Sequence, residues 1–385
     1  MKAPGSCLLT VLLASITAAI AQPTSERLTP TDNRFWPDLV KALQPGASPE
    51  ERSSASTVGQ DLATAGREDL VQVSAAFAKR TVCKPLVKDG KPVEPLAYIA
   101  EAAAGASVTM INEDHAGPLT RYFISQVAMR LRAEGYSAYG AETFTPQVSY
   151  DAVTPPIARE GYYLREPIYG RLVRQLRTEG YHLFPYEFIP LDDPKATWMA
   201  QAAAREVGEA ANLLRQVRSE KGTKVLVHVG HGHLTEYSAP GTTRQMGQVF
   251  AEASNINPLT IETTRFESPD SSFVVCDPQD FAGKPASVDI RIGVPKLTYE
   301  RGRVKWRHEA GDRFVDIPTS LQRPGQIAVF EARLSGERTD STPTDRLLLR
   351  PGENLPLLLP PGHYDLSVWT EKDGWSVSLP LRVAR

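Results

Sequence analysis

Short apolar runs alternate with amphipathic runs of helical period from residue 106 to residue 266. The apolar runs have the length of strands, and the runs between them place apolar residues three and four positions apart. Strands that alternate with helices form parallel sheets, because a crossover must return the chain to the same edge of the sheet. The sequence therefore predicts an α/β fold with a mostly parallel sheet flanked by helices.

A repeated hexapeptide marks two of the predicted helix-to-strand junctions. It reads Leu131-Arg-Ala-Glu-Gly-Tyr136 and then Leu176-Arg-Thr-Glu-Gly-Tyr181, with the glycine in the position of a helix cap. Glu142 and Glu187 each follow the tyrosine of their repeat by six residues. Helices are predicted over 61–79, 95–104, 119–131, 168–176, 196–221 and 243–253, and strands over 108–111, 136–144, 181–189, 224–229 and 258–266.

The pattern changes after about residue 284, where helical periodicity fades and short β-like runs alternate with Pro- and Gly-rich turns. This predicts a small antiparallel β-domain that is sandwich-like. Its runs lie at 288–294, 326–334, 347–349, 363–368 and 376–383. The expected organisation is a signal peptide over 1–21, a partly helical extension over 22–94, an α/β domain over 95–284 that carries the site, and a β-rich domain over 285–385.

The N-terminus has the pattern of a secretory signal peptide. Lys2 precedes a short apolar run over 7–20, and small residues precede a cleavage position near Ala21. We therefore expect an exported protein, periplasmic or extracellular, without stable membrane insertion, because no other apolar run is long enough to span a bilayer. An oxidising compartment permits a disulfide between Cys83 and Cys276, although two unpaired thiols would also suit the sequence.

The charge balance gives no sign of a polyanionic partner. The chain has 43 basic and 45 acidic residues, a formal net charge of -2 and a pI near 6.4. Proteins that bind nucleic acid concentrate positive charge on one face or along one segment. We therefore expect a small-molecule or peptide ligand and no nucleic acid.

Acidic and histidine side chains follow the ends of four predicted strands. Glu113 and His115 follow the first, Glu142 and Glu187 follow the next two, and the turn Gly230-His-Gly-His233 follows the fourth. The carboxyl ends of parallel strands share one edge of a sheet, so we expect these groups to line one cleft. A histidine that a carboxylate orients can act as a general base, and we expect Glu113, His115, Glu142 and His233 to be catalytic.

The same groups offer a donor set for zinc, manganese or iron, with His115, His233, Glu142 and His231 as candidate ligands. His231 and His233 alternate, so in an extended segment they share a face, whereas His228 is predicted to be a packed core histidine. Arg121 could hold an anionic group or pair with Glu113. The residues predicted to bind substrate or to support the site are Arg121, Glu187, Tyr162 and Arg165.

Three short motifs resemble those of a superfamily that includes erythromycin esterases, ChaN-like haem-binding lipoproteins and Tiki/TraB proteins. They are Asn112-Glu-Asp-His115, the Ala-Glu142-Thr segment and Gly230-His-Gly-His233-Leu, and the resemblance covers roughly residues 95–266. It carries over to Glu113, His115, Glu142 and His233. The chain departs from the family pattern at Asn112, where those proteins usually have glycine. The resemblance implies a histidine base without metal in esterase-like members, a metal-dependent protease in Tiki-like members and haem binding in ChaN-like members.

These residues fit two main functions of different classes. The first is an exported hydrolase of an unknown ester or amide, by His/Glu acid–base chemistry or metal-assisted hydrolysis, with His115 as base or ligand and Glu113 and Glu142 as its partners. The second is a non-enzymatic protein that holds haem or a metal ion, with Tyr162 and Tyr163 as axial or stacking contacts. A third is a scaffold whose site has decayed. The cofactor would be a divalent metal, haem or none. We favour the hydrolase, because several carboxylates and two histidines suit acid–base chemistry better than haem binding.

Overall fold

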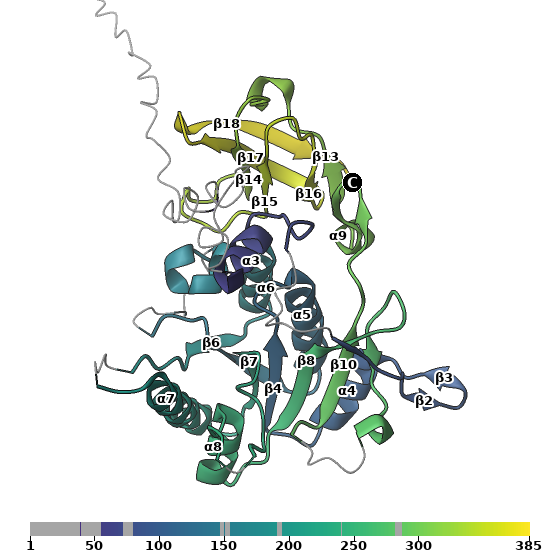
Figure 1. Cartoon of the computed structure of the whole chain (residues 1–385), viewed down its shortest axis with the longest axis vertical. Coiled ribbons are helices and arrows are strands. Elements are labelled where there is room, and N and C mark those ends of the chain that lie inside the picture. Colours follow the sequence, from purple (N-terminus) through teal and green to yellow (C-terminus); the bar gives the residue numbers. More distant parts are fainter. Residues whose placement is uncertain are drawn as a thin grey trace, which may run out of the picture.

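The computed structural model describes Leu39 and residues 55–71, 80–146, 150, 155–190, 195–239, 241–281 and 287–385. A central sheet contains β1 (Thr81–Val82), β4 (Val108–Glu113), β5 (Tyr136–Ala141), β6 (His182–Pro185), β7 (Lys224–Gly230), β8 (Leu259–Glu267), β9 (Val274–Val275) and β10 (Ile290–Val294). The strand order is β6-β5-β7-β4-β8-β10-β9, and β1 pairs with β8 (Figure 1). All pairings are parallel except that of β9 with β10. The predicted α/β class with a mostly parallel sheet is therefore confirmed.

Helices cover both faces of this sheet. One face carries the helices α4 (Pro95–Ala103), α5 (Pro118–Arg132) and α6 (Pro167–Thr178) (Figure 1). The other face carries α7 (Trp198–Ser219) and α8 (Met246–Ser254) (Figure 1). Side chains alternate along β4, so Met110 joins the α7 and α8 side and Ile111 joins the α5 side. Each such side chain contributes about 1.5–3 kcal/mol when it is fully buried.

The repeated hexapeptide forms the same junction twice. Gly135 and Gly180 both adopt positive φ, 90° and 70°, directly after α5 and α6, as a glycine helix cap requires. The strands that follow are shorter than predicted. Since β5 ends at Ala141 and β6 at Pro185, Glu142 and Glu187 lie just beyond the hydrogen-bonded strands rather than within them.

The C-terminal part forms small antiparallel sheets on a separate core (Figure 1). The larger sheet has the order β15 (Asp345–Leu349), β14 (Ala328–Leu334), β17 (Gly362–Thr370) and β18 (Gly374–Val383), and β13 (Arg313–Val315) pairs with β16 (Leu357–Leu359). The strand predicted at 288–294 is β10, which pairs with β8 and so completes the central sheet. The remaining elements are α3 (Ala55–Thr64), β2 (Val87–Lys88), β3 (Lys91–Pro92), β11 (Tyr299–Glu300), β12 (Arg303–Val304), α9 (Lys305–Glu309) and the 3₁₀ turns η1 (Ala158–Glu160), η2 (Tyr162–Arg165), η3 (Pro278–Phe281) and η4 (Thr319–Leu321).

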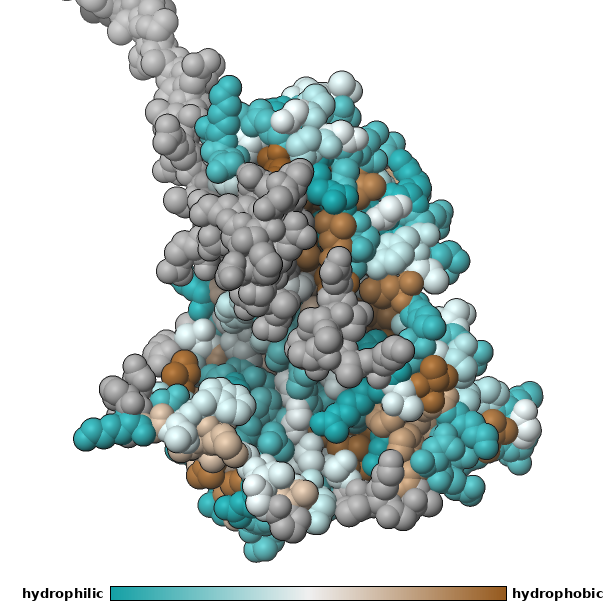
Figure 2. Space-filling view, in the orientation of Figure 1, coloured by the Kyte–Doolittle hydropathy of each residue, from teal (hydrophilic) through white to brown (hydrophobic). Residues whose placement is uncertain are grey.

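The predicted helix over 61–79 is wrong in its bounds, because α3 begins at Ala55 and ends at Thr64. The chain turns there at Gly66, whose φ of 68° interrupts a helix. Residues 72–79 and the predicted signal peptide lie outside the described residues. Within the described ranges, none of the helices combines the length and the apolar character that crossing a bilayer requires. Figure 2 shows hydrophilic side chains over most of the coloured surface in this view.

Cys83 and Cys276 form a disulfide, which settles the alternative that the sequence leaves open. The bond joins the segment after β1 to the segment after β9 across 193 positions of the chain, and both residues are buried. It therefore fastens the segment that follows β1 to the β9 edge of the central sheet.

We expect the Cys83→Ser variant to lose about 2–4 kcal/mol of unfolding free energy, because a crosslink between distant positions restricts the unfolded chain. Urea unfolding of the oxidised proteins measures the difference. The control is the same comparison in excess reductant, where the two proteins should unfold alike. Equal stability under oxidising conditions would contradict the stabilising role of the bond.

Candidate functional site

The ends of three neighbouring strands bring the predicted catalytic residues together. Glu113 is the last residue of β4 and pairs in register with Gly230, the last residue of β7. Glu142 directly follows β5, and its backbone N–H donates to the carbonyl of His228 on β7. His115 follows β4 by two positions. Strand pairing alone therefore places these groups at one edge of the sheet, at the carboxyl ends of parallel strands.

Glu113 and His115 form a buried acid–base pair. Glu113 shares a face of β4 with Ile111, which points it at Arg121 in the first turns of α5. Arg121 donates from Nε to Oε2 at 2.6 Å and from its terminal nitrogen to Oε1 at 2.8 Å. Burial alone would raise the pKa of Glu113, but the charges of Arg121 and His228 hold it well below its usual range. Since the ionised carboxylate only accepts, the His115 Nδ1 at 3.0 Å must donate, which leaves its Nε2 unprotonated when the ring is neutral.

A second layer of polar side chains supports Glu113 from below. The Nε2 of His228 lies 3.0 Å from Glu113 Oε2. On its other side, Nδ1 lies 2.7 Å from the hydroxyl of Tyr139 and 3.0 Å from that of Tyr169. His228 is buried, as predicted for a core histidine. These contacts leave the Glu113 carboxylate little freedom to turn away from His115.

Glu142 lies against the backbone of Gly230. Its Oε2 accepts from the Gly230 N–H at 2.5 Å, and its Oε1 accepts from Arg205 at 2.8 Å. A Cβ added to Gly230 would lie 2.6 Å from His115 Nε2 and 2.9 Å from Glu142 Oε2, so both side chains border the space above this residue. Burial raises the pKa of Glu142, but His233, His115 and Arg205 lower it to about 2. Glu142 is therefore ionised at neutral pH.

His233 and Glu206 form a second pair on the other side of Glu142. The Nδ1 of His233 lies 2.9 Å from Glu206 Oε1, and its Nε2 lies 3.8 Å from Glu142 Oε1. Burial lowers the pKa of His233, but the charges of Glu142 and Glu206 outweigh burial and raise it. Glu142 thus lies between two histidines, each held at Nδ1 by a buried glutamate.

Arg205 of α7 contacts a cluster of three carboxyl groups beside this site. One of its terminal nitrogens lies 2.8 Å from Glu142 Oε1, 2.7 Å from Glu187 Oε2 and 2.8 Å from Glu209 Oε1. Sequence reasoning missed Arg205, Glu206 and Glu209. The signal in the chain is that Glu206 and Glu209 fall at helical spacing with the buried Ala210 and Leu213, on the face where an amphipathic helix normally carries apolar residues.

Two groups of acidic and histidine side chains within the described residues have ligand atoms within 4.8 Å of one another. One contains Glu206, Glu209 and His233, and the other contains Glu142, Glu187 and Glu209. The guanidinium of Arg205 already contacts all three carboxylates of the second group. Of the four predicted metal ligands, His233 belongs to the first group and Glu142 to the second, whereas His115 and His231 belong to neither.

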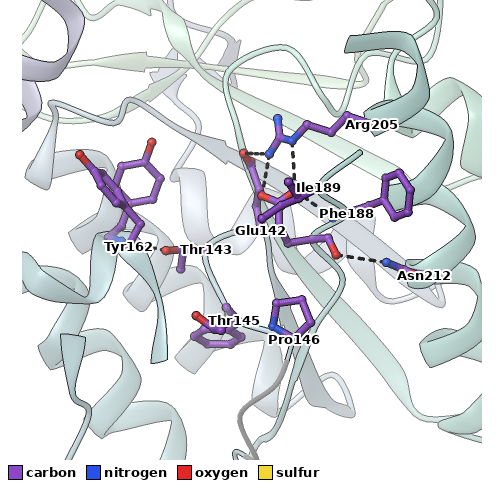
Figure 3. Close-up of a pocket in the computed structure, with 12 residues that line it drawn as sticks. Glu142, Thr143, Thr145, Pro146, Tyr162, Phe188, Ile189, Arg205 and Asn212 are labelled. Carbon is purple, nitrogen blue, oxygen red and sulfur yellow. Dashed lines mark hydrogen bonds and ion pairs between the residues drawn. The ribbon is translucent and has the colours of Figure 1, made fainter. Parts of the chain in front are cut away.

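A cleft of about 580 Å³ opens onto Glu142, Glu187 and Arg205 (Figure 3). Tyr162 and Tyr163 form one wall, and the ring of Tyr163 stacks on His115 with centroids 4.5 Å apart. Arg165, in contrast, is buried against the N-terminal part of the chain, where its guanidinium lies over Tyr162 and 3.9 Å from Asp61. The cleft reaches the charged groups and the aromatic cover of His115.

Asn112, which replaces the glycine of the family pattern, has a structural role. Its side-chain amide donates to the carbonyl of His231 at 2.5 Å and accepts from the Thr263 N–H at 2.6 Å. It therefore fixes the turn after β7 against β4 and β8. The ring of His231 lies 4.9 Å from that of His115, and burial followed by the His115 charge lowers the pKa of His231.

No protein-family model and no curated protein matches this chain. Among solved structures, it is similar to the type III effector HopBA1, with 15% identity, 57% of this chain and 98% of that chain covered, and a TM-score of 0.37. It is also similar to RRSP, a MARTX toxin effector domain from Vibrio vulnificus CMCP6, with 16% identity, 67% and 52% of the two chains covered, and a TM-score of 0.32. Likeness at these TM-scores supports no argument about activity.

We expect the Glu209→Gln variant to be more thermally stable than the natural chain at pH 8, by several degrees. Burial and then the Glu142 charge raise the pKa of Glu209 from 4.5 to about 11, so the folded protein must keep a proton that the unfolded chain releases. This costs nothing below pH 4.5 and costs more as the pH rises toward 11, so the gain should grow with pH. Melting temperatures between pH 5 and 9 measure it. Glu252→Gln at an exposed ion pair is the control. A gain that shrinks with rising pH would contradict the assignment.

Proposed function

We propose that this protein is an exported hydrolase of the erythromycin esterase/ChaN/Tiki type that cleaves an ester or amide by His/Glu acid–base chemistry. The observation that carries the proposal is the Glu113–His115 pair, whose free Nε2 borders the same space above Gly230 as the ionised Glu142. A base held by a buried carboxylate, next to a second anion and a cleft, is the arrangement that activates water.

In the proposed reaction, His115 Nε2 takes a proton from water while the water oxygen bonds to the carbonyl carbon of the substrate. Glu113 stabilises the imidazolium that forms, because its carboxylate already faces Nδ1. The bond from the carbonyl carbon to the leaving oxygen or nitrogen then breaks, and the leaving group takes a proton from His233. The raised pKa of His233 suits it to carry that proton. Transfer of the proton from His115 to His233, directly or through solvent, restores both histidines and completes the cycle.

We favour this form over metal-assisted hydrolysis because the guanidinium of Arg205 already places a fixed positive charge 2.8 Å from Glu142 Oε1, where a metal ion bound by Glu142 would have to lie beside a second cation. That charge and the His233 ring are the groups near enough to stabilise negative charge that develops on the carbonyl oxygen. Glu187 and Glu209 then act by holding Arg205 in place.

We expect His115→Ala to lower kcat/KM for any ester or amide that the natural chain hydrolyses by about 10²–10⁴-fold, the usual contribution of a general base. Glu142→Gln should lower it by less, because Glu142 holds the Gly230 turn and Arg205 in position and takes no proton. A screen of chromogenic esters and anilides finds the responsive substrate and then measures the variants. The control is His182→Ala, because His182 is exposed at the opposite end of the sheet. Unchanged rates in folded His115→Ala protein would rule out this mechanism.

A pair of glycine variants tests whether the close packing of His115 and Glu142 over Gly230 matters for activity, without altering either residue. We expect Gly230→Ala to reduce kcat at least about tenfold, because its methyl group would displace both side chains from their productive positions. Gly232→Ala is the matched control in the same turn, where an added Cβ meets only Gln245 at an ordinary 3.5 Å. Equal rates for the two variants would show that the close approach is unimportant.

A further inference from the structure

Exposed apolar side chains are concentrated in the segments that line the cleft. Of the eleven large hydrophobic residues that are exposed within the described part of the chain, six come from η2, the segment after β6 and α7. Figure 2 shows brown and tan side chains at the lower left, over the region where Figure 1 places β6 and α7. The six residues are Tyr162, Phe188, Ile189, Trp198, Met199 and Val207.

Three of these residues, Tyr162, Phe188 and Ile189, line the cleft itself (Figure 3). Ile189 is 79% exposed, although a side chain of this kind is normally covered. The ring of Phe188 is held against α7 at Gly208, where an added Cβ would lie 2.1 Å from it. The ring of Phe188 is therefore fixed on α7, whereas Ile189 next to it stays open to solvent.

The charged groups of the cleft are confined to its inner end. Glu142 and Glu187 both contact the Arg205 guanidinium, and Thr143 is bound to the backbone of Tyr163. An anionic group at this end would face two carboxylates that share one cation, so an uncharged carbonyl is the better fit. The outer walls offer apolar contacts from Phe144, Pro146 and the residues named above.

We infer that the substrate is an uncharged ester with an extended apolar acyl chain, whose carbonyl lies at Glu142 and whose chain runs along Phe188 and Ile189. This inference rests on the proposed function, because it places the acyl chain relative to the hydrolytic site. A cleft of about 580 Å³ has room for a medium-length chain in addition to the reacting group. The same chemistry could come from a soluble ester or from a membrane lipid.

The test uses p-nitrophenyl esters from acetate to decanoate with the whole chain. We expect kcat/KM to rise by up to about fourfold for each CH₂ group that the cleft buries. Ile189→Ser should lower the rate on octanoate severalfold more than it lowers the rate on acetate. Val87→Ser is the control, because Val87 is similarly exposed but lies in the β2–β3 hairpin. Rates that do not depend on chain length, or an equal effect of Ile189→Ser on all esters, would overturn the inference.

A binding measurement separates this inference from the proposed function. Methyl alkyl ketones cannot be hydrolysed, so their dissociation constants report the apolar contacts alone. We expect tighter binding with chain length in the natural chain and in His115→Ala, and a weaker dependence in Ile189→Ser. Ketone binding that tightens with chain length, without ester hydrolysis, would contradict the proposed function and support the apolar site. Ester hydrolysis with no chain-length dependence of ketone binding would support the function and contradict the apolar site. Release of fatty acid from phosphatidylcholine vesicles would assign a lipid source, and activity on soluble esters alone would assign a soluble one.

Discussion

The geometry of the site depends on one buried carboxylate, that of Glu113. A carboxylate without a partner could not remain ionised at this depth, so the fold surrounds it with cations and donors. Arg121 donates to both oxygens of Glu113, and His228 lies against the same carboxylate. The Nδ1 of His115 faces Glu113 Oε1, and this contact orients the His115 ring. Because Arg121 is itself buried, removing either charge of the pair would leave Arg121 with Glu166, or Glu113 with the two histidines, as remaining side-chain partners, at a cost of up to about 3–5 kcal/mol. Stability and the position of the base therefore depend on the same interaction.

The second half of the site repeats this arrangement with a helix in place of a strand. Glu206 of α7 orients His233, and Arg205 of the same helix holds Glu142. The carboxyl ends of β4, β5 and β7 supply the histidines and Glu142, while α7 supplies the charges that fix Glu142 and His233. A shift of α7 along the sheet would therefore change the relation between Glu142 and His233 and leave the Glu113–His115 pair in place.

The sequence contains enough information to predict the sheet and to bring Glu113, His115, Glu142 and His233 to one edge of it, because both follow from alternation and from strand ends. It did not reveal the partners of His233. Helical periodicity describes α7 through its apolar face, and nothing in that pattern says that Arg205 and Glu206 turn toward a site. Pairing of Cys83 with Cys276 and the place of β10 in the central sheet depend on contacts between segments far apart in the chain, which local patterns do not encode.

The central claim is that Glu113 fixes the tautomer of His115 so that Nε2 is the base. Long-range ¹H–¹⁵N correlation spectra of labelled protein at pH 8 read the protonated nitrogen of each histidine directly, and the signal that disappears in His115→Gln assigns the ring. Our account predicts that neutral His115 carries its proton on Nδ1, with Nε2 unprotonated, and that Glu113→Gln removes this preference. A His115 ring protonated on Nε2 in the natural chain would contradict it.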